Sequence, residues 1–92
     1  MGSSIVRSAH LALRARVAVR RGDLGTAAGF SRAAARVAVE EHIPLMAVLA
    51  GRERGGEEGN EIGREACELM GRSLEVVLQE LDQAQGESLP RP

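Results

Sequence analysis

Residues 61–84, EIGREACELMGRSLEVVLQELDQA, form the longest stretch of the chain that follows a single helical period. Apolar side chains recur along it every three or four residues, and charged side chains occupy the opposite face. The apolar face comprises Ile62, Ala66, Leu69, Met70, Leu74, Val76, Val77, Leu78 and Leu81. This pattern predicts one amphipathic helix over residues 61–84, held in place by its apolar face.

Part of this helix also has the spacing of a short coiled-coil seam. The seam comprises Cys67, Met70, Leu74, Val77, Leu81 and Ala84, and its central residues are Met70, Leu74, Val77 and Leu81. Two interpretations stay open for them: they cover the end of the chain's own helical array, or they form the interface of a homodimer. The width of the apolar face favours packing within a core, since a coiled coil needs about three to four heptads.

Glycine and proline divide the rest of the chain into further helices. Gly22 suits the end of one helix, and Asp23 or Thr26 suits the start of the next. Pro44 stops the second helix and is favoured in the first turn of a third. The predicted fold class is all-α, with antiparallel helical hairpins. Its four helices span about residues 5–21, 26–42, 44–54 and 61–84.

The first helix has two apolar faces, which is typical of an inner helix in a bundle or helical array. Val6, Leu13 and Val17 form the second of these faces. Before the last helix, a loop is predicted at Gly55, Gly56 and Gly59. Asn60 is expected to cap the helix that follows.

A chain of 92 residues suffices for one domain. We expect a helical domain over residues 5–85, a flexible N-terminus over residues 1–4 and a flexible tail over residues 86–92. The core is built from small side chains, with Phe30 as the only aromatic residue. So small a core gains stability from oligomerisation or from a partner.

Charge is distributed unevenly along the chain. Up to Arg36 there are seven Arg and one acid, and after it there are five Arg and twelve acids. The two halves can therefore pair within one chain or between copies. The net charge of −1 and the absence of Trp and Tyr argue against nucleic acid as a partner. The exclusive use of Arg as the cation is typical of a GC-rich bacterial genome.

The sequence offers no set of residues for catalysis. Lysine is absent, Cys67 is the only cysteine, and His10 and His42 lie on different helices. We therefore expect no enzymatic activity, no metal and no cofactor. The chain has no apolar run of about 18 residues and no signal-peptide pattern at its start, so no membrane association and a cytoplasmic location are expected.

Comparing the chain with itself at an offset of 34 residues superposes two short segments. Arg20, Gly22, Gly25 and Gly29 fall on Arg54, Gly56, Gly59 and Gly63. The offset divides the domain into possible repeats over about residues 10–43 and 44–77. In so glycine-rich a chain, a chance match stays open as the alternative.

A helix–turn–helix repeat of this length resembles the tetratricopeptide family, over about residues 11–74. The segment RRGDLGTAAGFSRAAA, residues 20–35, is similar to the turn and second helix of that repeat. Ala27 and Ala34 fit its small positions, whereas Ser31 stands where the family has an aromatic residue.

The resemblance implies a groove lined by the first helix of each hairpin. Its residues here would be Arg16, Val19, Arg20, Met46 and Arg54. An apolar groove with three Arg suits an acidic or C-terminal peptide segment, because guanidinium groups bind carboxylates in a bidentate manner. The alternative is that Arg16 and Arg20 pair with acids of the second half of the chain.

The predicted function is that of a non-enzymatic protein-interaction or adaptor module, which binds an acidic or peptide segment of a partner in this groove. The alternative is a homodimeric helical protein with a regulatory or structural role, whose apolar faces form the dimer interface.

Overall fold

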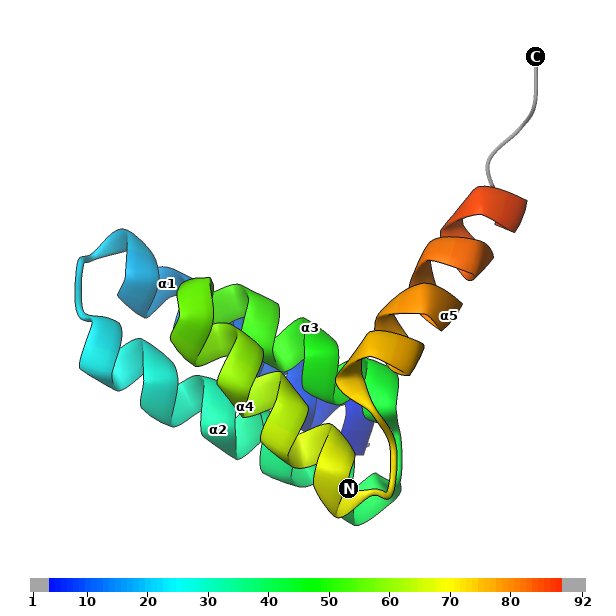
Figure 1. Ribbon diagram of the computed structural model, residues 1–92. Coiled ribbons are helices and arrows are strands. Elements are labelled where there is room, and N and C mark those ends of the chain that lie inside the picture. Colours follow the sequence, from blue (N-terminus) through cyan, green and yellow to red (C-terminus); the bar gives the residue numbers. More distant parts are fainter. Residues whose placement is uncertain (1–3, 89–92) are drawn as a thin grey trace.

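The computed structural model describes residues 4–88, with side chains up to residue 84. The helices in this part are α1 (Ser4–Arg20), α2 (Leu24–Glu41), α3 (Pro44–Arg54), α4 (Gly56–Leu69) and α5 (Leu74–Ser88). In Figure 1, α1 and α2 form one antiparallel hairpin, α3 and α4 form a second, and α5 points away from both. The all-α class is thus confirmed for the described residues, with five helices in place of four.

The turn between α1 and α2 is closed by hydrogen bonds at both helix ends. The amide of Asp23 donates to the carbonyl of Ala18 at 2.9 Å, and Gly22 adopts a left-handed φ of 79°, so a Schellman motif closes the end of α1. The Asp23 carboxylate then accepts from the amide of Thr26 at 3.2 Å and from its hydroxyl at 2.7 Å. Asp23 therefore caps α2, which begins at Leu24, slightly earlier than predicted.

The predicted single helix over residues 61–84 is wrong, because the chain turns between α4 and α5. Gly71 adopts a left-handed φ of 72°, and the amide of Arg72 donates to the carbonyl of Cys67 at 2.9 Å. The Ser73 hydroxyl accepts from the amide of Val76 at 3.4 Å and begins α5. The apolar period continues across this turn because both helices pack on the same core, so periodicity alone does not reveal the break.

The predicted loop before residue 61 is also wrong, since α4 already begins at Gly56 and contains Asn60. Gly55, with a φ of 74°, is the only residue between α3 and α4. So short a turn is possible because the two helices touch at Gly51 and Gly59. A Cβ atom added to either glycine would overlap the carbonyl oxygen of the other.

The two hairpins pack side by side: α1 contacts α3, α2 contacts α4, and α2 also contacts α3. Small side chains allow this close packing. The core cluster consists of Ala28, Ala34, Ala35, Ala38, Ala47, Val48, Ala50, Ile62, Ala66, Cys67, Leu74 and Val77.

Two buried serines form hydrogen bonds between helices within this core. The Ser8 hydroxyl donates to the carbonyl of Ala34 at 3.2 Å and joins α1 to α2. The Ser31 hydroxyl donates to the carbonyl of Ala50 and joins α2 to α3. Both hydroxyls are therefore satisfied without water.

The first turns of α5 pack on α3 and α4, and its later part projects away from the hairpins (Figure 1). Helix α5 continues to Ser88, past the predicted end at residue 84. The predictions for residues 1–3 and 89–92 lie outside the described part of the chain. None of the described helices is both long and apolar enough to cross a membrane.

Candidate functional site

The predicted groove begins at Arg16, whose guanidinium group forms a bidentate pair with Glu53 across α1 and α3. Its Nε lies 2.7 Å from Oε2 of Glu53, and one terminal nitrogen lies 2.6 Å from Oε1. These hydrogen bonds, and then the charge of Glu53, raise the pKa of Arg16. For Arg16, pairing within the chain is thus the arrangement that the structure shows.

The other residues of the predicted groove differ in how far their side chains are exposed. The Arg54 side chain is only 15% exposed, and it donates to Glu58 at 3.0 Å and to the carbonyl of Gly55 at 3.2 Å. Val19 and Met46 are half-buried. Arg20 is exposed and forms no ion pair with the described residues, so it alone among the predicted arginines offers a free guanidinium group.

Large apolar side chains are exposed on α1 and α3, the two helices that were expected to line the groove. We call the set Val6, Leu13, Val17, Leu45 and Leu49 the α1–α3 surface. Leu13 is 53% exposed and Leu49 is 45% exposed. The predicted second apolar face of the first helix supplies its α1 members, of which Val17 also lines a depression with Phe30 of α2.

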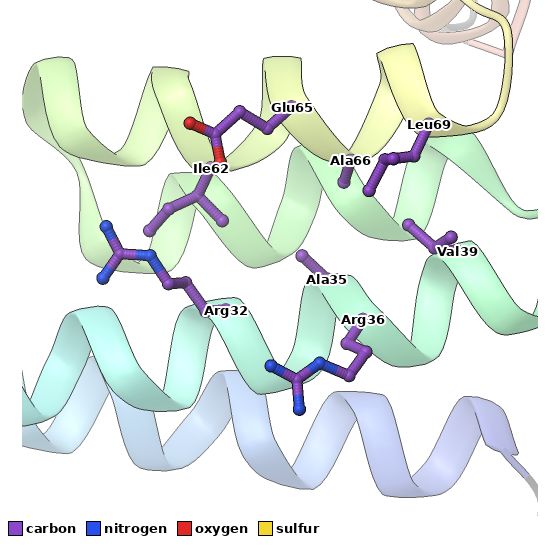
Figure 2. Close-up of a pocket in the computed structure, with 8 residues that line it drawn as sticks. All are labelled: Arg32, Ala35, Arg36, Val39, Ile62, Glu65, Ala66 and Leu69. Atoms are coloured by element: carbon purple, nitrogen blue, oxygen red, sulfur yellow. The ribbon is translucent and has the colours of Figure 1, made fainter.

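A shallow groove of about 220 Å³ lies between α2 and α4 (Figure 2). We call it the α2–α4 groove; its lining residues are Arg32, Ala35, Arg36, Val39, Ile62, Glu65, Ala66 and Leu69. Leu69, at one end, is 75% exposed, more than any other large hydrophobic side chain described. The sequence prediction placed Leu69 on the apolar face of a continuous helix and missed this groove.

The two edges of the α2–α4 groove carry opposite charges. Arg32 and Arg36 both start from α2, but Arg32 points towards α4 whereas the guanidinium group of Arg36 is turned towards α1; Glu65 extends from α4 at the other edge (Figure 2). Arg32 pairs with Glu58 at 3.2 Å. Within the described part of the chain, neither Arg36 nor Glu65 forms an ion pair. An unpaired cation and an unpaired anion thus flank an apolar floor.

The residues predicted to form either a cap or a dimer interface lie at the end of α4, for Met70, and in the first half of α5, for Leu74, Val77 and Leu81. Leu74 and Val77 are buried in the core, and Met70 packs against it. Leu81 is half-buried in a depression that it shares with Leu45 of α3. In this structure, Leu74 and Val77 therefore contact their own chain, in the manner of a cap.

The thiol of Cys67 is buried, and the imidazole of His10 forms a hydrogen bond. The thiol of Cys67 lies 4.0 Å from the carbonyl of Pro44, and burial raises its pKa. His10 accepts a hydrogen bond from Nε of Arg14 at 3.0 Å, and the Arg14 guanidinium lies 5.8 Å from the ring centre of Phe30. Over residues 4–84, no three His, Cys, Asp or Glu side chains come together as they would around a metal ion.

No protein-family model matches this chain, and neither a curated protein nor a solved structure does so. The tetratricopeptide resemblance, which rests on residues 11–74, stays a prediction.

Proposed function

We propose that this chain is a non-enzymatic protein-interaction module of tetratricopeptide type. Its α1–α3 surface binds an amphipathic, acidic segment of a partner protein. The observation that supports this most is the exposure of large apolar side chains on two helices that contact each other. A partner that covers large apolar side chains removes them from water, which is favourable.

The charges on these two helices favour an acidic partner. Arg20 on α1 and Arg52 on α3 are exposed and form no ion pair with the described residues. Glu53 of α3 is already neutralised by Arg16. A helix or extended peptide with apolar anchors would cover Leu13 and Leu49, and its carboxylates would bind the guanidinium groups.

The position of α5 supports a repeat-like arrangement. The first turns of α5 contact both helices of the second hairpin, α3 and α4. Its buried face carries Leu74 and Val77, and its exposed face carries Glu75, Gln79 and Glu80 together with Val76. Helical arrays need such a terminal helix with a polar outer face, because an uncovered last hairpin exposes its core.

The test is affinity purification from cells that express the chain, followed by binding of the purified partner segment. The disruptive variant carries Leu13→Glu and Leu49→Glu. The matched control carries Leu24→Glu and Val76→Glu, the same kind of change at two exposed apolar positions outside the α1–α3 surface. We expect a partner that the wild type and the control retain and the disruptive variant loses, with equal helicity in all three.

The preference for an acidic segment is tested by measuring binding of the purified segment by fluorescence anisotropy. We expect Arg20→Glu to weaken binding by about tenfold, the loss of one charge-assisted contact. A partner that the disruptive variant still retains would refute the α1–α3 surface. If Arg20→Glu leaves the affinity for the purified segment unchanged, the proposal that the segment binds through its acidic residues is refuted.

A further inference from the structure

We propose that the α2–α4 groove is the interface of a two-fold symmetric homodimer. The occupant of the groove is the same groove of a second copy. This surface shares no residue with the α1–α3 surface, so the inference does not depend on the partner proposed above.

Charge complementarity is the first argument. Arg36 stands at the α2 edge of the groove with its guanidinium group turned towards α1, from where rotation of its long side chain brings it over the edge (Figure 2). Glu65 stands at the α4 edge, and neither residue forms an ion pair in the described chain. Two copies related by a two-fold axis parallel to the groove place the α2 edge of one over the α4 edge of the other. Arg36 of each copy then meets Glu65 of the other, and symmetry forms this pair twice. An axis across the groove would instead set Arg36 against Arg36.

The apolar floor is the second argument. Ala35 and Ala66 are small, so the floor between the charged edges is open to a neighbouring side chain. At one end stands Leu69, 75% exposed and without cover from any described element. The same axis brings the Leu69 ends of both grooves together, which removes these side chains from water.

The mixed charge of the groove selects the second copy over other occupants. An acidic partner would be repelled by Glu65, and by Glu61 and Glu68, which are also exposed and unpaired within residues 4–84. A basic partner would be repelled by Arg36. A surface with one basic edge and one acidic edge is complementary to itself once it is turned about the groove axis.

Sedimentation equilibrium on the full chain tests the proposal with two charge reversals, Arg36→Glu and Glu65→Arg. We expect the wild type to associate from monomer to dimer with rising concentration. Each single variant should dimerise at least about tenfold more weakly, because each creates two like-charge contacts. Arg21→Glu, a reversal outside the groove, is the control and should dimerise like the wild type.

Mixing the two single variants is the decisive step. In a mixed dimer, the glutamate introduced at position 36 of one copy meets the arginine introduced at position 65 of the other. The unchanged Glu65 of the first copy meets the unchanged Arg36 of the second. We therefore expect the mixture to form heterodimers about as tightly as the wild type forms homodimers.

Recovery in the mixture also shows that both variants are folded. A wild type that stays monomeric, single variants that dimerise normally, or a mixture without recovery would each overturn the proposal.

Discussion

At the scale of single residues, the contact between Gly51 and Gly59 brings two helix backbones directly together. Gly51→Ala would push a methyl group into the carbonyl oxygen of Gly59. We expect the free energy of unfolding, measured by urea denaturation, to fall by about 1–3 kcal/mol, as for other overpacked sites.

Gly29 provides the matched control, since a Cβ atom there meets nothing within 4 Å. It lies inside α2, where alanine is the better helix former. Gly29→Ala should therefore raise the free energy of unfolding by about 0.5–1 kcal/mol. Equal effects of the two substitutions would show that Gly51 does not touch Gly59.

His42 is the one non-glycine residue with positive φ in the described chain, at 55°. It ends α2, and the following amide, of Ile43, donates to the carbonyl of Ala38 at 3.0 Å. Glycine adopts this left-handed conformation without steric cost. We expect His42→Gly to raise the free energy of unfolding by about 0.5–1 kcal/mol. A lower melting temperature for this variant would contradict a steric cost of the positive φ at His42.

Asp23 makes the stability of the first hairpin depend on pH. Its hydrogen bonds with Thr26 lower its pKa below the ordinary value. A carboxyl group with a lower pKa in the folded state contributes stability above its unfolded pKa, and that contribution is lost as the pH falls through the folded pKa. We expect Asp23→Asn, which keeps a cap but cannot titrate there, to reduce the loss of stability between neutral pH and acid.

Thermal unfolding of both proteins across this pH range is the measurement. If the melting temperatures of the wild type and Asp23→Asn fall in parallel with pH, the Asp23 carboxylate does not accept hydrogen bonds from Thr26 in the folded state.

At the scale of helices, the sequence predicted the elements well where a proline or a single glycine marks a boundary. Pro44 placed the start of α3 correctly, and Gly22 with Asp23 placed the first turn. Gly55 also ends α3 as predicted, whereas Gly56 and Gly59, expected in a loop, lie inside α4, and Gly71 ends α4 where a continuous helix was expected. Whether a glycine breaks a helix, turns it or lets a neighbour approach depends on which helix packs beside it, and the local sequence does not contain that information.

The packing of α4 against α3 gives a test at this scale. Cys67 is fully buried, and burial raises the pKa of its thiol. A thiol reagent can reach it only when α4 separates from the rest of the molecule. We expect the labelling rate in native buffer to be far below that in urea and to rise with Gly51→Ala. Labelling of the native protein as fast as a free thiol would show that α4 does not pack as described.

At the scale of the whole molecule, the sequence predicted an apolar face and the pairing of opposite charges. It did not predict which side chains remain exposed or without an ion pair. The second apolar face of α1 was visible in the spacing of Val6, Leu13 and Val17. The uneven charge correctly suggested pairing, and the structure shows it between Arg16 and Glu53. The α2–α4 groove joins residues about thirty positions apart along the chain, so only the packing of the hairpins could reveal it.

The two proposals give the two surfaces separate roles: the α2–α4 groove pairs with a second copy, and the α1–α3 surface stays open for a partner. Methyl NMR spectra of the full chain, recorded from dilute to concentrated solution, test this most directly. We expect the methyl signals of Val39, Ile62 and Leu69 to shift with concentration and those of Leu13 and Leu49 to stay unchanged. Shifts at Leu13 and Leu49, or spectra that do not change with concentration, would contradict it.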